Sequence, residues 1–222
     1  MKVGTDGVLL GAWCMQGIGS DLPLRVLDVG TGSGLIALMV AQRFASAQIT
    51  AIDIDEAAVE QARENFARSP WHNRLNALLC PFSDLPPDVK YDAIVSNPPY
   101  FVDSLLNPSA LRTAARHAVS LSLDTLIQGS ALLLEDCGTL SLVLPAEQEK
   151  NAVAVAASCG LVLRRLTKVF TKQGKPQKRS LMEWQKSVFD TALQPVTDTL
   201  VLMEDNAPRS EKYAALTKDF YL

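Results

Sequence analysis

The sequence has few of the residues that build metal sites and disulfide frameworks. Its 222 residues include two histidines and four cysteines. The cysteines are scattered and form no Cys-x-x-Cys pair, a pattern that argues against a zinc site or a disulfide framework; they are Cys14, Cys80, Cys137 and Cys159. We therefore expect no bound metal, and we expect reduced thiols in a cytoplasmic protein.

Long apolar runs, repeats and a large positive charge are also missing. No stretch approaches the roughly 18–20 apolar residues of a bilayer-spanning helix, and the segment that opens with Met1 contains no recognisable secretory signal. The net charge of −3 excludes a globally basic nucleic-acid binder, so RNA contact would need a local basic patch. With 48% hydrophobic residues, the chain is sufficient for one α/β domain over residues 1–222. We expect a monomer.

A glycine-rich turn stands near the start of the chain. The apolar run 25–30 predicts a buried strand, and Leu35 to about Phe44 predicts a helix after the turn. A strand, a glycine turn and a helix begin a nucleotide-binding βαβ unit. The glycines alternate, at Gly30, Gly32 and Gly34, whereas the third glycine of the dinucleotide pattern G-x-G-x-x-G would fall at position 35.

Alternating glycines let the backbone pass close beneath a ligand. Asp28, at the end of the strand, can hold a cationic amino group, which a pyrophosphate does not have. The pattern therefore favours a nucleoside that carries an amino acid over a dinucleotide.

Carboxylates also follow the next two predicted strands. Gln48 to Asp53 ends in Asp53, about 20 residues past the glycine turn, where a carboxylate binds ribose hydroxyls. Ile54 is then placed to flank an adenine ring, and Asp55 is a good N-cap for a helix at 56–68. After a third strand at 75–80 comes Asp84, either a contact to an adenine amino group or a solvated loop acid.

The N-terminal segment is predicted to be a loop that leads into a helix. Thr5 and Asp6 are both fair N-cap residues. The alternative for Asp6 is a carboxylate that faces the cofactor.

The most informative stretch is Asn97-Pro98-Pro99-Tyr100, directly after a predicted strand from Tyr91 to Ser96. The prolines lack N–H groups, and Asn97 precedes a proline and is held extended. The stretch therefore presents the Asn97 amide oxygen and the Pro98 carbonyl as acceptors, with the Tyr100 ring beside them. These groups fit a planar exocyclic amine, and acceptors assist its attack where positive charge develops. The alternative is a surface turn that merely ends a strand.

The rest of the chain predicts further strands at 138–144, 161–170 and 180–188, with one more at 199–203, and helices at 121–134, 147–158 and 210–218. The strands at 161–170 and 180–188 are predicted to form a hairpin. Its first part, Leu161 to Met182, carries seven basic residues and no acidic one: Arg164, Arg165, Lys168, Lys172, Lys175, Lys178 and Arg179. In an acidic protein this cluster favours docking of a polyanion, although charge runs are often only solvated surface.

A second, shorter basic stretch follows the prolines. It contains Arg112, Arg116 and His117. We interpret it as either a phosphate contact near the mouth of the site or the solvated charges of a helix.

Together, the motif Asp28 to Gly34, Asp53 and Asn97-Pro98-Pro99-Tyr100 resemble the S-adenosylmethionine-dependent amino-methyltransferases. Further segments of the sequence resemble the bacterial tRNA (adenine-N6)-methyltransferase family. They are the segment 2–13, Phe101, the stretch 115–117, Gly174-Lys175-Pro176 and the terminal Phe220-Tyr221-Leu222. The likeness covers essentially the whole chain. Family members usually carry a further stretch before the position of Lys2, and an acidic residue where this chain has Ala118.

The resemblance implies a Rossmann-like class I methyltransferase fold of the α/β class, with a mostly parallel seven-stranded sheet, flanking helices and an antiparallel C-terminal hairpin. It implies S-adenosylmethionine as cofactor and methylation of adenine 37 of a valine tRNA. The implied cofactor-binding residues are Thr5, Asp6, Asp28, Gly30, Thr31, Gly32, Gly34, Asp53, Ile54 and Asp84. The implied catalytic residues are Asn97, Pro98, Pro99 and Tyr100, and the implied RNA contacts are Arg112, Arg116, His117, Lys172, Lys175, Lys178 and Arg179.

Three alternatives stay open at this point. A protein-glutamine methyltransferase would use the same Asn-Pro-Pro-Tyr loop without a polyanion surface. A ribosomal-RNA base methyltransferase is poorly separated from a tRNA enzyme by sequence. A non-catalytic module that binds the cofactor or RNA would not need the loop to be intact.

Overall fold

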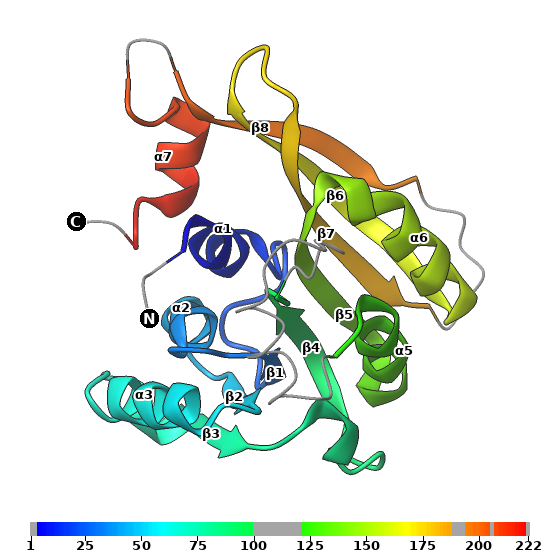
Figure 1. The fold of residues 1–222 in the computed structure, drawn as a ribbon. Coiled ribbons are helices and arrows are strands. Elements are labelled where there is room, and N and C mark those ends of the chain that lie inside the picture. Colours follow the sequence, from blue (N-terminus) through cyan, green and yellow to red (C-terminus); the bar gives the residue numbers. More distant parts are fainter. Residues whose placement is uncertain (1–3, 100–120, 188–193, 205–206, 221–222) are drawn as a thin grey trace, which may run out of the picture.

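A single mixed β-sheet organises the protein (Figure 1). The computed structural model describes residues 4–99, 121–187, 194–204 and 207–220. The sheet has eight strands in the order β3-β2-β1-β4-β5-β7-β6-β8. The strands are β1 (Arg25–Val29), β2 (Gln48–Asp53), β3 (Leu75–Leu79), β4 (Tyr91–Ser96), β5 (Leu134–Pro145), β6 (Leu161–Lys172), β7 (Gln177–Lys186) and β8 (Val196–Met203).

Strands β1 to β5 pair in parallel, and β7 runs antiparallel to both β5 and β6. The predicted α/β class, the mostly parallel sheet and the antiparallel hairpin are therefore confirmed. The count of seven strands was too low, because β8 pairs in parallel with β6 and belongs to the same sheet. Strands β5 and β6 are also longer than predicted, and the end proposed for the last hairpin strand, Val188, lies outside the described residues.

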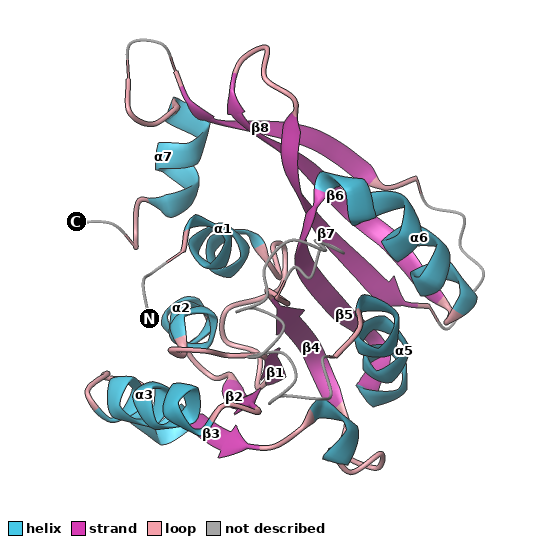
Figure 2. Ribbon diagram, in the orientation of Figure 1, coloured by secondary structure: helices cyan, strands magenta, loops and turns pink. Residues whose placement is uncertain are grey.

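The helices cover the two faces of the sheet (Figure 2). They are α1 (Thr5–Trp13), α2 (Leu35–Arg43), α3 (Glu56–Ala67), α5 (Leu123–Leu133), α6 (Glu149–Ser158) and α7 (Glu211–Thr217), with short 3₁₀ turns at His72–Arg74, Phe82–Asp84 and Ala146–Gln148. One hydrophobic cluster joins α1, α2, α3 and α7 to the sheet, and a second joins α5 and α6 to its other face. No helix in the described ranges is both long and apolar enough to cross a bilayer.

Two N-cap predictions had different outcomes. The Asp55 carboxylate accepts a hydrogen bond from the Ala57 N–H at 3.0 Å, so the predicted cap of α3 is confirmed. The predicted cap of α1 at Thr5 or Asp6 is wrong, because Gly4 occupies that position and contributes no side-chain bond. Asp6 lies in the first turn of α1, and its carboxylate binds a β7 residue instead.

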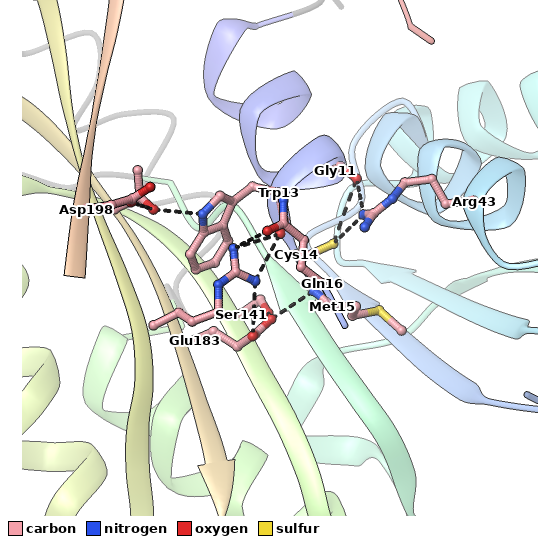
Figure 3. A network of polar contacts seen from close by, with 11 residues as sticks. Gly11, Trp13, Cys14, Met15, Gln16, Arg43, Ser141, Glu183 and Asp198 are labelled. Atoms are coloured by element: carbon pink, nitrogen blue, oxygen red, sulfur yellow. Dashed lines mark hydrogen bonds and ion pairs between the residues drawn. The ribbon is translucent and has the colours of Figure 1, made fainter. Parts of the chain in front are cut away.

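A buried polar network fastens the end of α1 to the sheet (Figure 3). The Glu183 carboxylate on β7 accepts hydrogen bonds from the Met15 backbone N–H at 2.8 Å and the Ser141 hydroxyl at 2.9 Å, and pairs with Arg165 at 3.3 Å. The Arg165 guanidinium also lies 4.1 Å from the centre of the Trp13 ring. Glu183 is only 5% exposed. Its charge is therefore held by donors from the end of α1 and from strands β5 and β6.

We expect Glu183→Ala to lower the free energy of unfolding by about 3 kcal/mol, because it leaves the Arg165 charge without its buried partner. Urea unfolding followed by circular dichroism measures this change. Glu135→Ala is the control: Glu135 pairs with Arg25 at 2.5 Å, but both side chains are largely exposed, and such pairs contribute less than about 1 kcal/mol. Equal losses in the two variants would contradict a supporting role for the buried network.

Candidate active site

The glycine turn bends between β1 and α2 at the carboxyl edge of the sheet. Gly30, Gly32 and Gly34 have φ values of 69°, 57° and 81°, in the left-handed region that favours glycine. Gly34 has a second constraint, because a Cβ atom there would lie 2.4 Å from Cε1 of Phe66 on α3. A Cβ atom on Gly30 would have no neighbour within 4 Å, so the backbone at Gly30 is accessible from the open side of the turn.

Strand β2 holds the glycine turn in place. The Gly30 and Thr31 N–H groups donate to the Ile52 carbonyl at 2.9 and 3.0 Å. One oxygen of the Asp53 carboxylate accepts from the Gly32 N–H at 2.9 Å, and the other accepts from the Asp55 N–H at 3.0 Å. Asp53 therefore shapes the turn, and its carboxylate lies against the glycine backbone. Its predicted contact with ribose hydroxyls stays a prediction.

Asp28 is the buried acid of the site. One carboxylate oxygen, Oδ2, accepts from the Thr31 hydroxyl at 2.7 Å and from the Ala37 N–H in the first turns of α2 at 3.2 Å. The other, Oδ1, is buried and has no hydrogen-bond partner. Burial raises the pKa of the Asp28 carboxyl to about 6, against the opposing effect of the bonds from Thr31 and Ala37. An orphaned carboxylate oxygen beneath a glycine turn is suited to a cationic donor from a ligand.

Two more predicted residues lie at the same edge. Ile54 directly follows β2 and is 46% exposed, so its side chain is accessible at this edge. Asp84 ends the 3₁₀ turn that follows β3, and its carboxylate accepts from the Ser83 hydroxyl at 2.9 Å. Because β1, β2 and β3 are parallel, these side chains and the glycine turn come from the same edge of the sheet.

The Asn-Pro-Pro corner leaves the sheet beside the glycine turn. Val29 at the end of β1 is in register with Ser96 at the end of β4, and the Ser96 hydroxyl donates to the Val29 carbonyl at 2.7 Å. The next residues along the two strands are Gly30 and Asn97. Asn97 is half-buried, Pro98 is buried and Pro99 is exposed. Tyr100 lies outside the described residues.

Asp6 and Arg179, assigned by sequence to different sites, bind each other. Arg179 Nε lies 2.8 Å from the Asp6 carboxylate, and both side chains are about one quarter exposed or less. Thr5, beside Asp6, is exposed at the start of α1. The sequence did not predict that Thr5 and Asp6 lie near the hairpin, because no local pattern relates position 6 to position 179.

The hairpin carries its basic residues in two different settings. Arg165 is taken up by the buried network described above, and Arg179 by Asp6. Lys175 and Lys178 are exposed and Lys172 is half-buried, all close to the turn at 173–176. Because β6 runs parallel to β5, this turn extends from the same edge of the sheet as the Asn-Pro-Pro corner. Arg112, Arg116 and His117 lie outside the described residues.

Sequence reasoning missed Glu183, which organises the contacts of the hairpin with α1. The count of basic residues stopped at Met182, one position before it. The only sequence signal was an acidic residue within an apolar strand. That pattern does not reveal which basic side chain pairs with Glu183.

This arrangement is that of a nucleoside-binding methyltransferase fold, and comparison with known proteins agrees. Residues 14–171 match the family model of the methyltransferase small domain. Among solved structures, a protein of Agrobacterium tumefaciens described as a predicted O-methyltransferase superposes with a TM-score of 0.74 over 96% of this chain and 95% of its own, at 18% identity. A putative RNA methyltransferase of Pyrococcus horikoshii superposes with a TM-score of 0.56 over 82% of this chain and 82% of its own, at 15% identity. At these identities the likeness concerns the fold.

Sequence relatives define the family more narrowly. The tRNA1(Val) (adenine(37)-N6)-methyltransferase of Parabacteroides distasonis is 45% identical over 100% of this chain and 91% of its own length. That of Bacteroides fragilis is 43% identical over the same shares, and that of Flavobacterium psychrophilum is 40% identical over 100% of this chain and 93% of its own length. The chain belongs to the tRNA1(Val) (adenine(37)-N6)-methyltransferase family.

We expect Asp28→Asn to raise the thermal unfolding midpoint of the ligand-free protein at about pH 7.5. The carboxyl has a pKa of about 6 when folded and an ordinary value of 3.8. The folded state therefore binds its proton more readily, so the ionised group destabilises the fold above pH ~6 and does so less as the pH falls towards 3.8. Circular dichroism melts of both proteins at about pH 7.5 and 4.5 test the sign: the advantage of the variant should shrink at the lower pH. An advantage that grows instead would contradict the assignment.

Proposed function

We propose that this chain transfers a methyl group from S-adenosylmethionine to the exocyclic N6 amine of adenine 37 in a valine tRNA. The observation that carries the proposal is the register of β1 with β4, which brings the Asn-Pro-Pro corner out beside the glycine turn. Relatives that are 40–45% identical over the whole chain bear the name of this activity. The tRNA is the proposed partner and S-adenosylmethionine the proposed cofactor.

The residues at the carboxyl edge fit the proposed cofactor. Asp28 offers a buried oxygen without a partner to the methionine amino group, and Asp53 would accept from the ribose hydroxyls. Gly30 leaves the backbone accessible to the cofactor, Gly32 and Gly34 complete the turn, and Ile54 and Asp84 would flank and bind the adenine. Thr5 and Asp6 complete this set from the start of α1. When bound, S-adenosylmethionine supplies an electrophilic methyl group.

The Asn97 corner would orient and activate the target amine. The lone pair of an exocyclic adenine amine is delocalised into the ring, so the amine is a weak nucleophile. The Asn97 amide oxygen and the Pro98 carbonyl would accept its two hydrogens and stabilise the positive charge that develops on nitrogen. Pro99 keeps the corner rigid, and Tyr100 would stack on the base after it leaves the anticodon loop. Positioning for in-line attack then matters more than a strong base.

The tip of the hairpin is the proposed docking surface for the tRNA. Lys172, Lys175 and Lys178 lie at the edge of the sheet from which the Asn97 corner emerges. Phosphate contacts at this position would orient the anticodon stem while the base enters the site. Arg112, Arg116 and His117 remain predicted contacts. A protein-glutamine substrate would make no use of this charge, which favours tRNA over that alternative.

We expect the purified protein to transfer label from methyl-labelled cofactor to total tRNA, and the label to appear as N6-methyladenosine at position 37. Asn97→Ala should lower turnover roughly 10²–10³-fold, as removal of one preorganised partner does. Nucleoside analysis after digestion identifies the product. Asn76→Ala, at an exposed position on β3, is the matched control and should keep normal turnover.

Parallel reactions with RNase-treated tRNA, ribosomal RNA and a protein lysate separate the alternatives. Label in protein would favour the glutamine methyltransferase, and label in ribosomal RNA alone would favour the ribosomal enzyme. No transfer to any of these substrates, with the cofactor still bound, would favour a non-catalytic module. Near-normal turnover of Asn97→Ala would remove the proposed role of that residue.

We expect Lys172, Lys175 and Lys178 replaced together by Ala to weaken tRNA binding and to flatten its dependence on salt. For every phosphate that the variant no longer neutralises, the slope of log K against log salt should fall by about 0.7–0.9. Fluorescence anisotropy with labelled tRNA across a salt series measures both effects.

The matched control removes three basic residues elsewhere, by changing Arg25, Arg68 and Lys90 to Ala. These residues lie away from the hairpin, and the net charge changes by the same amount. A salt slope that falls equally in both triple variants would indicate a general charge effect, with no docking at the hairpin.

A further inference from the structure

Strand β7 holds helix α1 at both of its ends. Arg179 binds Asp6 in the first turn of the helix, and Glu183 binds the Met15 N–H just beyond its last turn. Four residues of an antiparallel strand span about 14 Å, and a nine-residue helix is also about 14 Å long. The two anchors on β7 are thus spaced to match the length of α1, which runs in the same direction as the strand.

The start of α1 packs against helix α2, which directly follows the glycine turn. A Cβ atom on Gly7 would lie 3.3 Å from Cδ2 of Leu35, the residue that follows Gly34. Further along, Arg43 of α2 donates to the Gly11 carbonyl at 2.8 Å. The N-terminus of α1 has no side-chain cap. Among the contacts of the described residues, the ion pair between Arg179 and Asp6 is what positions this end of the helix. A shift of this end would be transmitted to Leu35 and the turn.

Arg179 also differs from its neighbours in the direction it faces. Side chains alternate along a strand, and Arg179 shares a face with Leu181, which belongs to the hydrophobic cluster beneath α1. The next residue, Ser180, faces the other way, and its hydroxyl donates to Glu149 of α6 at 2.7 Å. Lys178 stands where the register of β7 with β6 shifts, and it is exposed. The Arg179 guanidinium donates to both Asp6 and the Lys178 carbonyl, and its side chain is only 21% exposed.

We propose that Arg179 is a positioning residue of the cofactor site, which it serves by holding Asp6 and the start of α1 against the glycine turn, and that it is not an RNA contact. This inference rests on the proposed function for the identity of the cofactor. The proposal gives two adjacent basic residues different roles. Arg179 contributes to cofactor affinity, and Lys178 contributes to tRNA affinity.

The test compares Arg179→Ala with Lys178→Ala in the full chain. Calorimetric titration with S-adenosylhomocysteine measures the cofactor site, and anisotropy with tRNA across a salt series measures the RNA surface. Arg179→Ala should weaken S-adenosylhomocysteine roughly tenfold and leave the salt slope unchanged. Lys178→Ala should do the reverse, with unchanged S-adenosylhomocysteine affinity and a slope reduced by about 0.7–0.9.

A double-mutant cycle links the effect to the ion pair. Asp6→Asn alone should weaken S-adenosylhomocysteine by a similar factor, and Asp6→Asn with Arg179→Ala should weaken it no further. Thermal melts establish that all variants are folded, and Arg179→Lys should recover part of the affinity because it keeps the charge.

The outcomes separate the two proposals. Normal S-adenosylhomocysteine affinity in Arg179→Ala, or effects of the two substitutions that simply add, would overturn the positioning role and leave the proposed function intact. A reduced salt slope in Arg179→Ala would return that residue to the RNA surface. A wild-type protein that does not bind S-adenosylhomocysteine would contradict the proposed function itself.

Discussion

The parallel pairing of β1 with β2 on one side and β4 on the other is the constraint on which the rest of the structure depends. It brings the glycine turn, Asp53 and Asn97 to one edge, although they are far apart in the chain. Hydrogen bonds between neighbouring strand ends then fix the geometry of the site. Ile52 and Asp53 hold the glycine turn, and the Ser96 hydroxyl connects the end of β4 to β1. A site built on strand ends is more rigid than one built on loops.

The sheet also carries charge inside its core, which is costly unless the charge is well bonded. Asp28 and Glu183 lie on one row across the sheet. Asp28 is in register with Val95 on β4, Val95 with Ser141 on β5, and Ser141 with Glu183 on β7. Each carboxylate accepts a backbone N–H from a segment of the covering layer, Asp28 from Ala37 of α2 and Glu183 from Met15, two residues after α1. Glu183 is fully satisfied, whereas Asp28 keeps one oxygen without a partner. This contrast supports a structural role for Glu183 and agrees with the role proposed for Asp28 in binding the cofactor.

The C-terminal hairpin connects the two halves of the proposed function. One face of β7 supports α1 and so the wall of the glycine turn, and the tip between β6 and β7 presents lysines at the same edge. One element serves both purposes, because Arg179 is paired with Asp6 at the start of α1 whereas Lys178 is exposed. Charge alone therefore says little about the role of a basic residue in this hairpin.

Local patterns were enough to predict the parts of this protein that depend on local physics. Apolar runs predicted β2 and β4 with the bounds observed. The glycines predicted a turn between the first strand and its helix, and the Asn-Pro-Pro stretch marked the residue at which β4 ends. A helix cap at Asp55 was also predictable, because its partner is two residues away. Only the tertiary structure decided which charges meet: Asp6 with Arg179, and Arg165 with Glu183 and the Trp13 ring. Those pairs join residues 18 to 173 positions apart, and the packing of α1 on β7 selects them among many possible partners of equal charge.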